Sequence, residues 1–341
     1  MSQSATKHAP LTVVMYHYVR PIRSGPTPRL KGLEVDAFRG QLAYLRRHYE
    51  PVSVAEVIAA SRGEHVLPRN ALLLTFDDGY RDHVETVCPL LLDARMTGAF
   101  YPIVDAVLHG QVLGVNKLHF VLALAPDTAG VVEAVERLIL ADPEAASLPP
   151  LAELRASHRH ATRLDDADVI YVKRLIQMAL PVPMRKRISD ALFREFVTRD
   201  EAGFASELYA SADELRALAA AGMHVGCHGA SHPWMSRLDR AAQAEEVEQS
   251  LRLLDHLGVP RTDFTFCYPY GDYDATSLDV LGAAGCAAAF TAEVAIADVT
   301  PAAMLRLPRL DTIDLPVAAD AAPNEWTRQV APVHLKTATV R

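Results

Sequence analysis

The chain has 341 residues, half of them hydrophobic and 22% charged, so it can bury a large core and is not intrinsically disordered. Its 34 Lys and Arg against 42 Asp and Glu give a net charge of −8, which excludes a general nucleic-acid binder with a basic face. No run of about 18 apolar residues occurs, so no membrane-spanning helix is expected. The N-terminus has no apolar stretch of signal-peptide length and the four cysteines form no C-x-x-C pair, so we expect a cytoplasmic protein with reduced thiols.

Strand and helix patterns alternate along the chain. Short apolar runs predict buried strands at residues 11–16, 71–76, 98–101, 223–227, 263–267 and 287–291. Helical periodicity predicts helices over 36–47 and 239–257, and Ser211 with Glu214 predicts a capping box at the start of a helix that ends near Gly222. Continuous apolar strands separated by helices are typical of a parallel sheet covered on both faces, either open or closed as a barrel.

The middle of the chain interrupts this alternation. From about residue 110 to 205 the patterns are helical only, including 118–124, 130–140 and 168–180. We therefore predict an α/β unit formed by residues 1–110 and 206–341. Residues 111–205 would be a helical insertion in one of its loops.

Two acidic residues end the second predicted strand. Asp77 and Asp78 follow its apolar run and precede Gly79. An Asp-Asp-Gly sequence is commonly a solvated turn. Two adjacent carboxylates beside a buried strand are costly, however, unless a cation such as a metal ion binds one of them.

A pair of histidines, His228 and His232, follows another strand. Their spacing is that of a zinc-binding helix, but Gly229 and Pro233 oppose a helix and no Glu follows the first His, so the pair is expected on a loop. Two histidines at this spacing are often ordinary surface residues. Together with Asp78 they would provide three ligands and an open position for water, as in catalytic zinc sites.

Two further strand ends carry candidate residues. His17 follows the first strand, where a lone histidine is commonly a hydrogen-bonded core residue, and YPYG at 268–271 is by itself an ordinary turn. Active sites of β/α barrels lie at the carboxyl ends of parallel strands and draw residues from several of them. Because four strand ends carry such groups, the sequence predicts an enzyme.

At these positions the sequence resembles the polysaccharide deacetylases with NodB homology, carbohydrate esterase family 4. TFDDGY at 75–80, HGASHP at 228–233 and CYPYG at 267–271 are similar to three ordered motifs of that family. MYHYV at 15–19 resembles the branch with an N-terminal MYH motif. The resemblance covers about 1–110 and 206–310. It implies a distorted (β/α)7 barrel, a divalent metal that is usually zinc, and removal of an N-acyl group from an amino sugar.

The resemblance also implies a role for each candidate residue. The metal ligands would be Asp78, His228 and His232. Asp77 would be the general base, and His17 would be the general acid that protonates the leaving amine. The backbone N–H of Tyr268 or of its neighbour would help to hold the oxyanion.

The sequence departs from the family in three places. Gly229 stands where Ser or Thr usually follows the first His, so a hydrogen bond that braces the loop is missing. Cys267 stands where an Arg usually orients the base; Arg309 is the best substitute and Arg306 the next. A C-terminal Leu-x-His motif is absent in clear form, and His334, which could equally be an ordinary tail histidine, is the candidate for it.

These assignments predict a zinc-dependent N-deacetylase or N-deformylase, in which another divalent metal could replace zinc. The expected substrate is a nucleotide- or lipid-linked amino sugar, an intracellular precursor of a surface polysaccharide such as O-antigen. Lys117, His119 and the basic stretch 155–163 could contact its phosphate, although such a stretch is commonly a solvated face. Two alternatives stay open: a cyclic-amide hydrolase of a related barrel, and an inactive metal-containing glycan-binding protein, which the missing Arg favours.

Overall fold

The computed structural model describes residues 10–162 and 165–331, and these form two compact units. The first unit contains residues 33–110 and the described parts of 1–20 and 206–341. The second contains residues 21–32 and the described parts of 111–205. The sequence does not predict that residues 21–32 group with the helical segment, because hydrophobic periodicity indicates helices and strands but not the unit to which a loop belongs.

Parallel strands form the centre of the first unit. β1 (Pro10–Tyr16) pairs with β3 (Ala71–Asp78), β3 with β4 (Ala99–Pro102), and β4 with β5 (His224–Val225). A bridge between Cys227 and Phe266 leads to β6 (Thr265–Cys267), which pairs with β7 (Ala288–Phe290). A bridge between Phe290 and Leu307 leads to β9 (Leu310–Asp311), which pairs with β1. Within the described residues these seven strands form a closed ring, which confirms the predicted (β/α)7 barrel.

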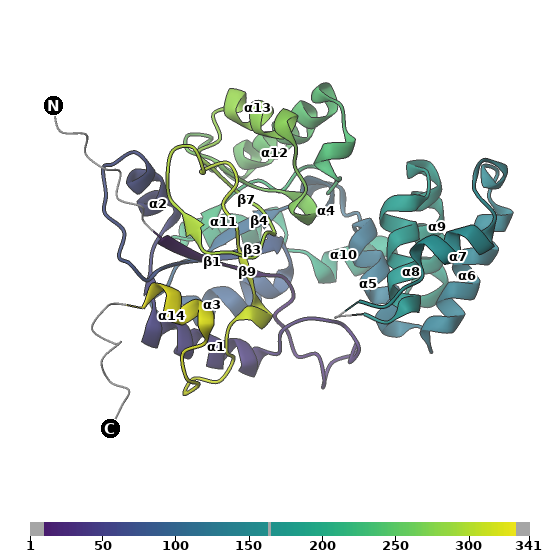
Figure 1. Ribbon diagram of the computed structural model, residues 1–341, viewed down its shortest axis with the longest axis horizontal. Helices are drawn as coiled ribbons and strands as arrows, with labels where there is room; N and C mark the ends of the chain where they lie inside the picture. The colour runs from purple at the N-terminus through teal and green to yellow at the C-terminus, as the bar shows by residue number, and fades with distance from the viewer. Residues whose placement is uncertain (1–9, 163–164, 332–341) are drawn as a thin grey trace. The chain divides into compact units, whose positions relative to one another are not determined.

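Helices cover the outside of this ring. α1 (Val35–His48) and α3 (Cys88–Asp93) lie on one side of the strands, and α12 (Arg240–Leu257) and α13 (Ala275–Ala284) lie on the other (Figure 1). α11 (Ala212–Ala220) begins at the Ser211–Glu214 capping box, as predicted. The remaining elements of this unit are short: β2 (Glu50–Pro51), α2 (Val54–Ser61), α4 (Val104–His109), β8 (Ala297–Asp298) and α14 (Glu325–Val330).

Alternation along β3 decides which of its side chains enter the barrel. Leu72, Leu74 and Phe76 pack in the cluster that contains the apolar face of α1. Ala71 and Leu73 belong instead to a cluster with residues of β4, β6 and β7. Because successive strand side chains point to opposite faces, Thr75 and Asp77 continue the inward row of Ala71 and Leu73. The strand therefore carries an acidic side chain into the end of the barrel.

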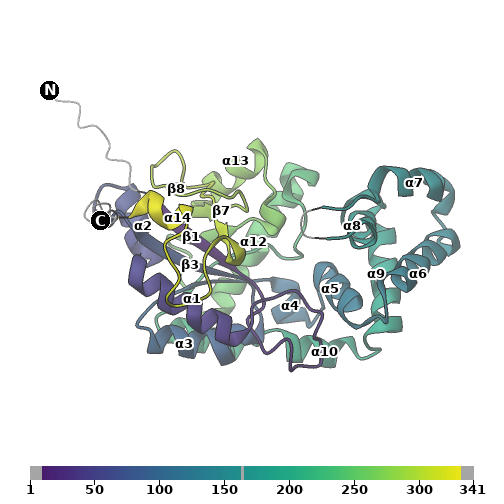
Figure 2. The same cartoon turned by 60° about the horizontal axis from the view of Figure 1, so that its bottom comes forward.

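The second unit is helical, as its periodicity predicts (Figure 2). Its helices are α5 (Gly114–Leu124), α6 (Thr128–Ala141), α7 (Leu151–His158), α8 (Ala167–Arg174) and α9 (Val182–Phe196); α10 (Glu201–Leu208) begins in this unit. Its core includes Leu118, Val135, Tyr171 and Ile188. Among the described residues no helix has the length and apolar character needed to cross a bilayer.

Several basic residues of this unit that were expected to contact phosphate form ion pairs with carboxylates instead. Lys117 is buried and forms ion pairs with Asp190 and Glu201. Arg155 pairs with Glu136, and Arg159 pairs with Asp168. These cations are already neutralised by carboxylates, which argues against a phosphate-binding role. Arg163, at the end of the basic stretch, lies outside the described residues.

Candidate active site

Asp77 is the innermost acidic residue at the carboxyl end of β3. It is 2% exposed and accepts two hydrogen bonds from Arg309, whose Nη1 lies 2.9 Å from Oδ1 and whose Nη2 lies 2.8 Å from Oδ2. The guanidinium also donates to the hydroxyl of Thr75 and to the carbonyl of Thr291. Arg309, predicted from the sequence as the substitute for the missing motif Arg, therefore reaches Asp77, whereas Arg306 is exposed.

This ion pair fixes the charge of Asp77. Burial opposes ionisation of the carboxyl group, but the Arg309 guanidinium and, to a smaller extent, His228 outweigh it and lower the pKa of Asp77 to about 2. Asp77 is consequently a carboxylate throughout the neutral range. The planar guanidinium of Arg309 binds both oxygens of Asp77, so it orients the carboxylate and also keeps it ionised.

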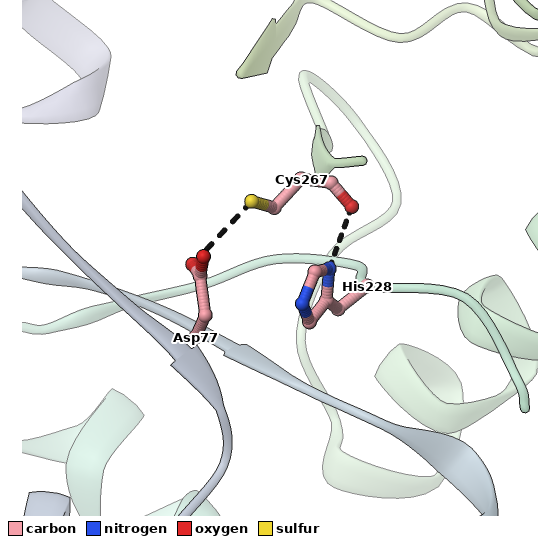
Figure 3. A group of neighbouring side chains, drawn as sticks. All are labelled: Asp77, His228 and Cys267. Carbon is pink, nitrogen blue, oxygen red and sulfur yellow. Dashed lines mark hydrogen bonds between the residues drawn. The ribbon is translucent and has the colours of Figure 1, made fainter. Parts of the chain in front are cut away.

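Cys267 occupies the position of the missing Arg and also contacts the base. Its thiol points at Asp77, with Sγ 3.3 Å from Oδ1, and its carbonyl oxygen points at His228 (Figure 3). Burial raises the pKa of the Cys267 thiol, so the thiol keeps its proton and donates a hydrogen bond to the carboxylate. No contact of this side chain was predicted from the sequence; its place in the third motif was the available signal.

Asp78, His228 and His232 converge on one point beside Asp77. The Asp78 Oδ1 atom lies 3.5 Å from His228 Nε2 and 3.6 Å from His232 Nε2. Asp78 and His232 both have positive φ angles, 72° and 59°, a backbone conformation that residues other than glycine rarely adopt. Gly79 follows with φ 69°, where a Cβ would lie 2.9 Å from Pro102. The histidine pair lies on a loop rather than a helix, as predicted.

The three side chains fit the requirements of a divalent metal. Ligand atoms about 2.0–2.2 Å from a tetrahedral zinc lie about 3.3–3.6 Å apart, which matches the two distances measured from Asp78 Oδ1. This buried oxygen accepts no hydrogen bond from any described residue. Burial lowers the pKa of His232 to about 3, which leaves its ring neutral and able to ligate. The arrangement is a candidate metal site.

The surrounding residues orient these ligands. His228 Nδ1 lies 2.7 Å from the Cys267 carbonyl oxygen and donates to it, so Nε2, on the side of Asp78, is the atom that would ligate a metal. The Tyr80 hydroxyl donates to Asp78 Oδ2. Tyr80 belongs to the first motif, but the sequence analysis gave it no function. Such outer contacts set the tautomer and the ring orientation of a ligand.

A second triad, Asp77, His228 and Cys267, also brings three potential ligand atoms together (Figure 3). Two facts make it a poorer metal site. Asp77 is already neutralised by the Arg309 guanidinium, whose charge would repel a cation. Cys267 would have to lose a proton whose pKa burial raises. We therefore favour the triad formed by Asp78 and the two histidines.

His17 lies directly after β1 at the same end of the barrel. Its Nε2 is 3.9 Å from Asp77 Oδ2, and its side chain is 42% exposed. The alternative that His17 is an ordinary buried core histidine therefore does not apply to its ring. Its carbonyl oxygen is held by the ring of His83, which is 1% exposed and lies with Nε2 at 2.9 Å. His83 was not singled out from the sequence, because an isolated histidine in a helix carries no signal.

His83 provides a pH-dependent contribution to stability. Burial, partly opposed by the hydrogen bond to the His17 carbonyl, lowers its pKa from 6.5 to about 4. Between these values the unfolded chain binds a proton that the folded chain does not, so stability falls as the pH falls from 6.5 toward 4. We expect His83 to account for a loss of about 2 kcal/mol in the free energy of unfolding between pH 7 and 5.

Replacing His83 by glutamine tests this contribution, because glutamine keeps a donor to the His17 carbonyl but does not titrate. Urea unfolding at both pH values should show a smaller loss in His83→Gln; equal losses would contradict this origin.

Tyr268 does not fit the role that the sequence analysis gave it. Its backbone N–H donates to the Phe290 carbonyl at 3.0 Å, within the pairing of β6 and β7, and its hydroxyl donates to the Leu305 carbonyl. The amide is thus engaged in the barrel wall, which argues against its binding an oxyanion. The next residue, Pro269, has no N–H, so the neighbouring amide is that of Tyr270. Of the remaining candidates, His334 lies outside the described residues.

Comparison with known proteins matches this chain to deacetylases. The polysaccharide deacetylase family model matches residues 193–289. The poly-beta-1,6-N-acetyl-D-glucosamine N-deacetylase of Escherichia coli (strain K12) is 31% identical over 104 residues, which are 30% of this chain and 15% of that protein. The chain therefore matches only a small part of that relative.

Two solved structures share the fold over nearly the whole chain. The Streptococcus pyogenes deacetylase PplD, in complex with acetate, has a TM-score of 0.56 and 15% identity, and the match covers 95% of this chain and 100% of PplD. IcaB from Ammonifex degensii has a TM-score of 0.54 and 18% identity, with 94% and 96% covered. At these identities the likeness shows the fold. The chain is thus similar to polysaccharide deacetylases in sequence over residues 193–289 and in fold over nearly its whole length.

Proposed function

We propose that this protein is a metal-dependent N-deacetylase that acts on an amino sugar. The observation that carries the proposal is the juxtaposition at the end of β3. There Asp77, held as a carboxylate by Arg309, lies one residue from Asp78, which meets two histidines at metal-ligand separations. A general base beside a three-ligand metal site provides the groups that metal-assisted amide hydrolysis requires.

Each residue of the site has a separate role in the proposed reaction. Asp78, His228 and His232 would hold the metal, which when bound acidifies water and polarises the acyl carbonyl. Asp77 accepts the proton of the attacking water, and Arg309 keeps it ionised and aimed. An amine leaves poorly as an anion, so collapse of the tetrahedral intermediate requires a proton. His17, partly exposed at the rim and 3.9 Å from Asp77, donates that proton to the nitrogen.

The substrate proposal combines two arguments. The E. coli relative is named for poly-beta-1,6-N-acetyl-D-glucosamine, which supports acetyl as the acyl group and N-acetylglucosamine as the sugar. The sequence, which lacks a stretch like a signal peptide, favours a nucleotide- or lipid-linked precursor of surface polysaccharide in the cytoplasm. We propose that the substrate contains an N-acetylglucosamine unit, which both a polymer and a linked precursor can provide. The pairing of Arg309 with Asp77 removes the feature that favoured an inactive glycan-binding protein.

The proposal is tested by metal content and deacetylation together. The purified chain should retain about one divalent metal ion and release acetate from β-1,6-linked N-acetylglucosamine oligomers or from UDP-N-acetylglucosamine. The two substrates distinguish a polymer from a linked precursor, and N-formyl analogues and cyclic ureides test the alternatives. In His232→Ala we expect loss of both metal and activity with the far-UV circular dichroism spectrum retained. Stoichiometric metal in that variant would contradict the ligand assignment.

The role of His17 predicts a difference between leaving groups. Replacing His17 by Ala removes the proton donor, so kcat for N-acetyl amides should fall by about 10²–10⁴-fold. Activated aryl acetates, whose phenolate leaves without a proton, should be much less affected. Metal content should not change, because His17 is outside the ligand set. Equal losses on amide and ester would show that His17 does not act as the acid.

A further inference from the structure

The loop that carries both histidines lacks the side chain expected to brace it. Gly229, which follows His228, has φ +80°, a conformation that favours glycine. A Cβ at this position would also lie 3.1 Å from Oε2 of Glu246. Neither Ser nor Thr fits here without strain. The loop from His228 to His232 must therefore be held by a residue from elsewhere in the chain.

Glu246, on the second turn of α12, makes those contacts. Its Oε2 accepts hydrogen bonds from the N–H groups of Ala230, at 2.6 Å, and of Ser231, at 3.0 Å. Its Oε1 accepts one from the Ser231 hydroxyl at 2.7 Å. A single carboxylate thus binds the two consecutive amides between the histidines. Hydrogen bonds to an ionised acceptor are about twice as strong as neutral ones.

Contacts on the other sides complete the support. The Ala230 carbonyl accepts a hydrogen bond from the N–H of Asp105, in the first turn of α4, at 2.9 Å. Beyond His232, the N–H and hydroxyl of Ser236 both donate to Asp272. α12 is an 18-residue helix with its own buried face, so Glu246 stands on a rigid element. The loop backbone is fixed near its middle by Glu246, and the turn that follows it is fixed by Asp272.

We infer that Glu246 is a positioning residue that presets His228 and His232 for metal binding, in place of the hydroxyl that the second motif lacks. This inference rests on the proposed function, because it assigns Glu246 to the metal site of that function. Among the described residues Glu246 forms no hydrogen bond or ion pair with either ligand ring; it acts through the loop amides next to them. Removal of supporting contacts around metal ligands weakens metal affinity by about 10–100-fold.

The test measures zinc affinity directly. Zn²⁺ dissociation constants of the full chain are determined by competition with a chromogenic chelator for the wild type, Glu246→Ala and Glu246→Gln. Glu245→Ala is the matched control, because Glu245 is the exposed neighbour on the same helix and its carboxylate contacts Gln249. We expect Glu246→Ala to bind Zn²⁺ about 10–100-fold more weakly and Glu245→Ala to bind as the wild type does. Glu246→Gln, which keeps an acceptor oxygen for the amides, should lie between them.

The outcomes separate this inference from the proposed function. At saturating Zn²⁺, Glu246→Ala should regain most of the wild-type kcat, since the chemistry uses other groups. An unchanged dissociation constant in both Glu246 variants overturns the inference alone. An equal loss in Glu245→Ala also overturns it, because the effect would then belong to the helix. Failure of the wild type to bind metal overturns the proposed function and the inference with it.

Discussion

Replacing Asp77 by asparagine is expected to lower kcat by about 10²–10⁴-fold while the metal stays bound. Asparagine has nearly the same shape but cannot accept the proton of the attacking water. Asp78, His228 and His232 remain in place, so the affinity for metal should be preserved. Steady-state deacetylation and metal analysis of the same preparation check both parts.

This substitution has a side effect that needs a control. Arg309 is 1% exposed, and Asp77→Asn would leave its charge buried without a counter-ion. The double variant Asp77→Asn/Arg309→Met removes both charges and should be more stable than Asp77→Asn alone. If its kcat is as low as that of Asp77→Asn, the loss of activity follows from the base and not from the unpaired charge. Turnover near the wild-type level in Asp77→Asn would make Asp77 a structural residue.

Replacing Arg309 by methionine is expected to lower the free energy of unfolding by about 3–5 kcal/mol, because one partner of a buried ion pair remains uncompensated. Methionine fills much of the guanidinium volume but provides none of its hydrogen bonds to Asp77, Thr75 and Thr291. Urea unfolding of the wild type, both single variants and the double variant forms a cycle that yields the coupling energy. Arg306→Met, an exposed arginine three residues earlier, is the control and should be neutral.

The same variant should change the pH dependence of activity. Arg309 lowers the pKa of Asp77 to about 2 against the opposing effect of burial. Without Arg309, burial prevails and the pKa of Asp77 rises, so the carboxylate is lost at a higher pH than in the wild type. The acid limb of the kcat/KM profile should therefore move to higher pH. A stable Arg309→Met protein with an unshifted profile would show that Arg309 does not set the state of the base.

The sequence predicts the long elements and the ends of the strands well. β1 and β3 are continuous apolar runs that are recognised directly in the sequence, and their ends lead to His17 and Asp77. β9, with two residues, has no periodicity, and its position next to β1 depends on contacts far along the chain. Arg309 was predicted because the family pattern requires an Arg that orients the base, and Cys267 stands in its usual position. This is a chemical requirement rather than a local signal.

The errors and omissions have a common physical origin. Tyr268 was assigned from its motif, but its amide is used by strand pairing, which sequence alone does not locate to the residue. Glu246 is an acidic residue on an amphipathic helix, where exposed charges are ordinary, and only the fold brings it to Ala230 and Ser231. The contact of Cys267 with Asp77 likewise joins residues 190 positions apart. Local patterns give the identity of the groups, whereas tertiary packing decides which of their atoms are still available.

The closed ring of strands constrains the order in which the protein can fold during synthesis. β4 ends at Pro102 and its neighbour β5 begins at His224, so the larger part of the helical unit, residues 111–205, is made between two strands that pair directly. If the helical unit collapses first around its own core, the chain segment that β4 and β5 must close becomes shorter and the entropic cost of joining them falls. The last gap closes only when Leu310 meets Val14. Asp77 emerges from the ribosome long before Arg309, and until then its carboxylate must remain in water.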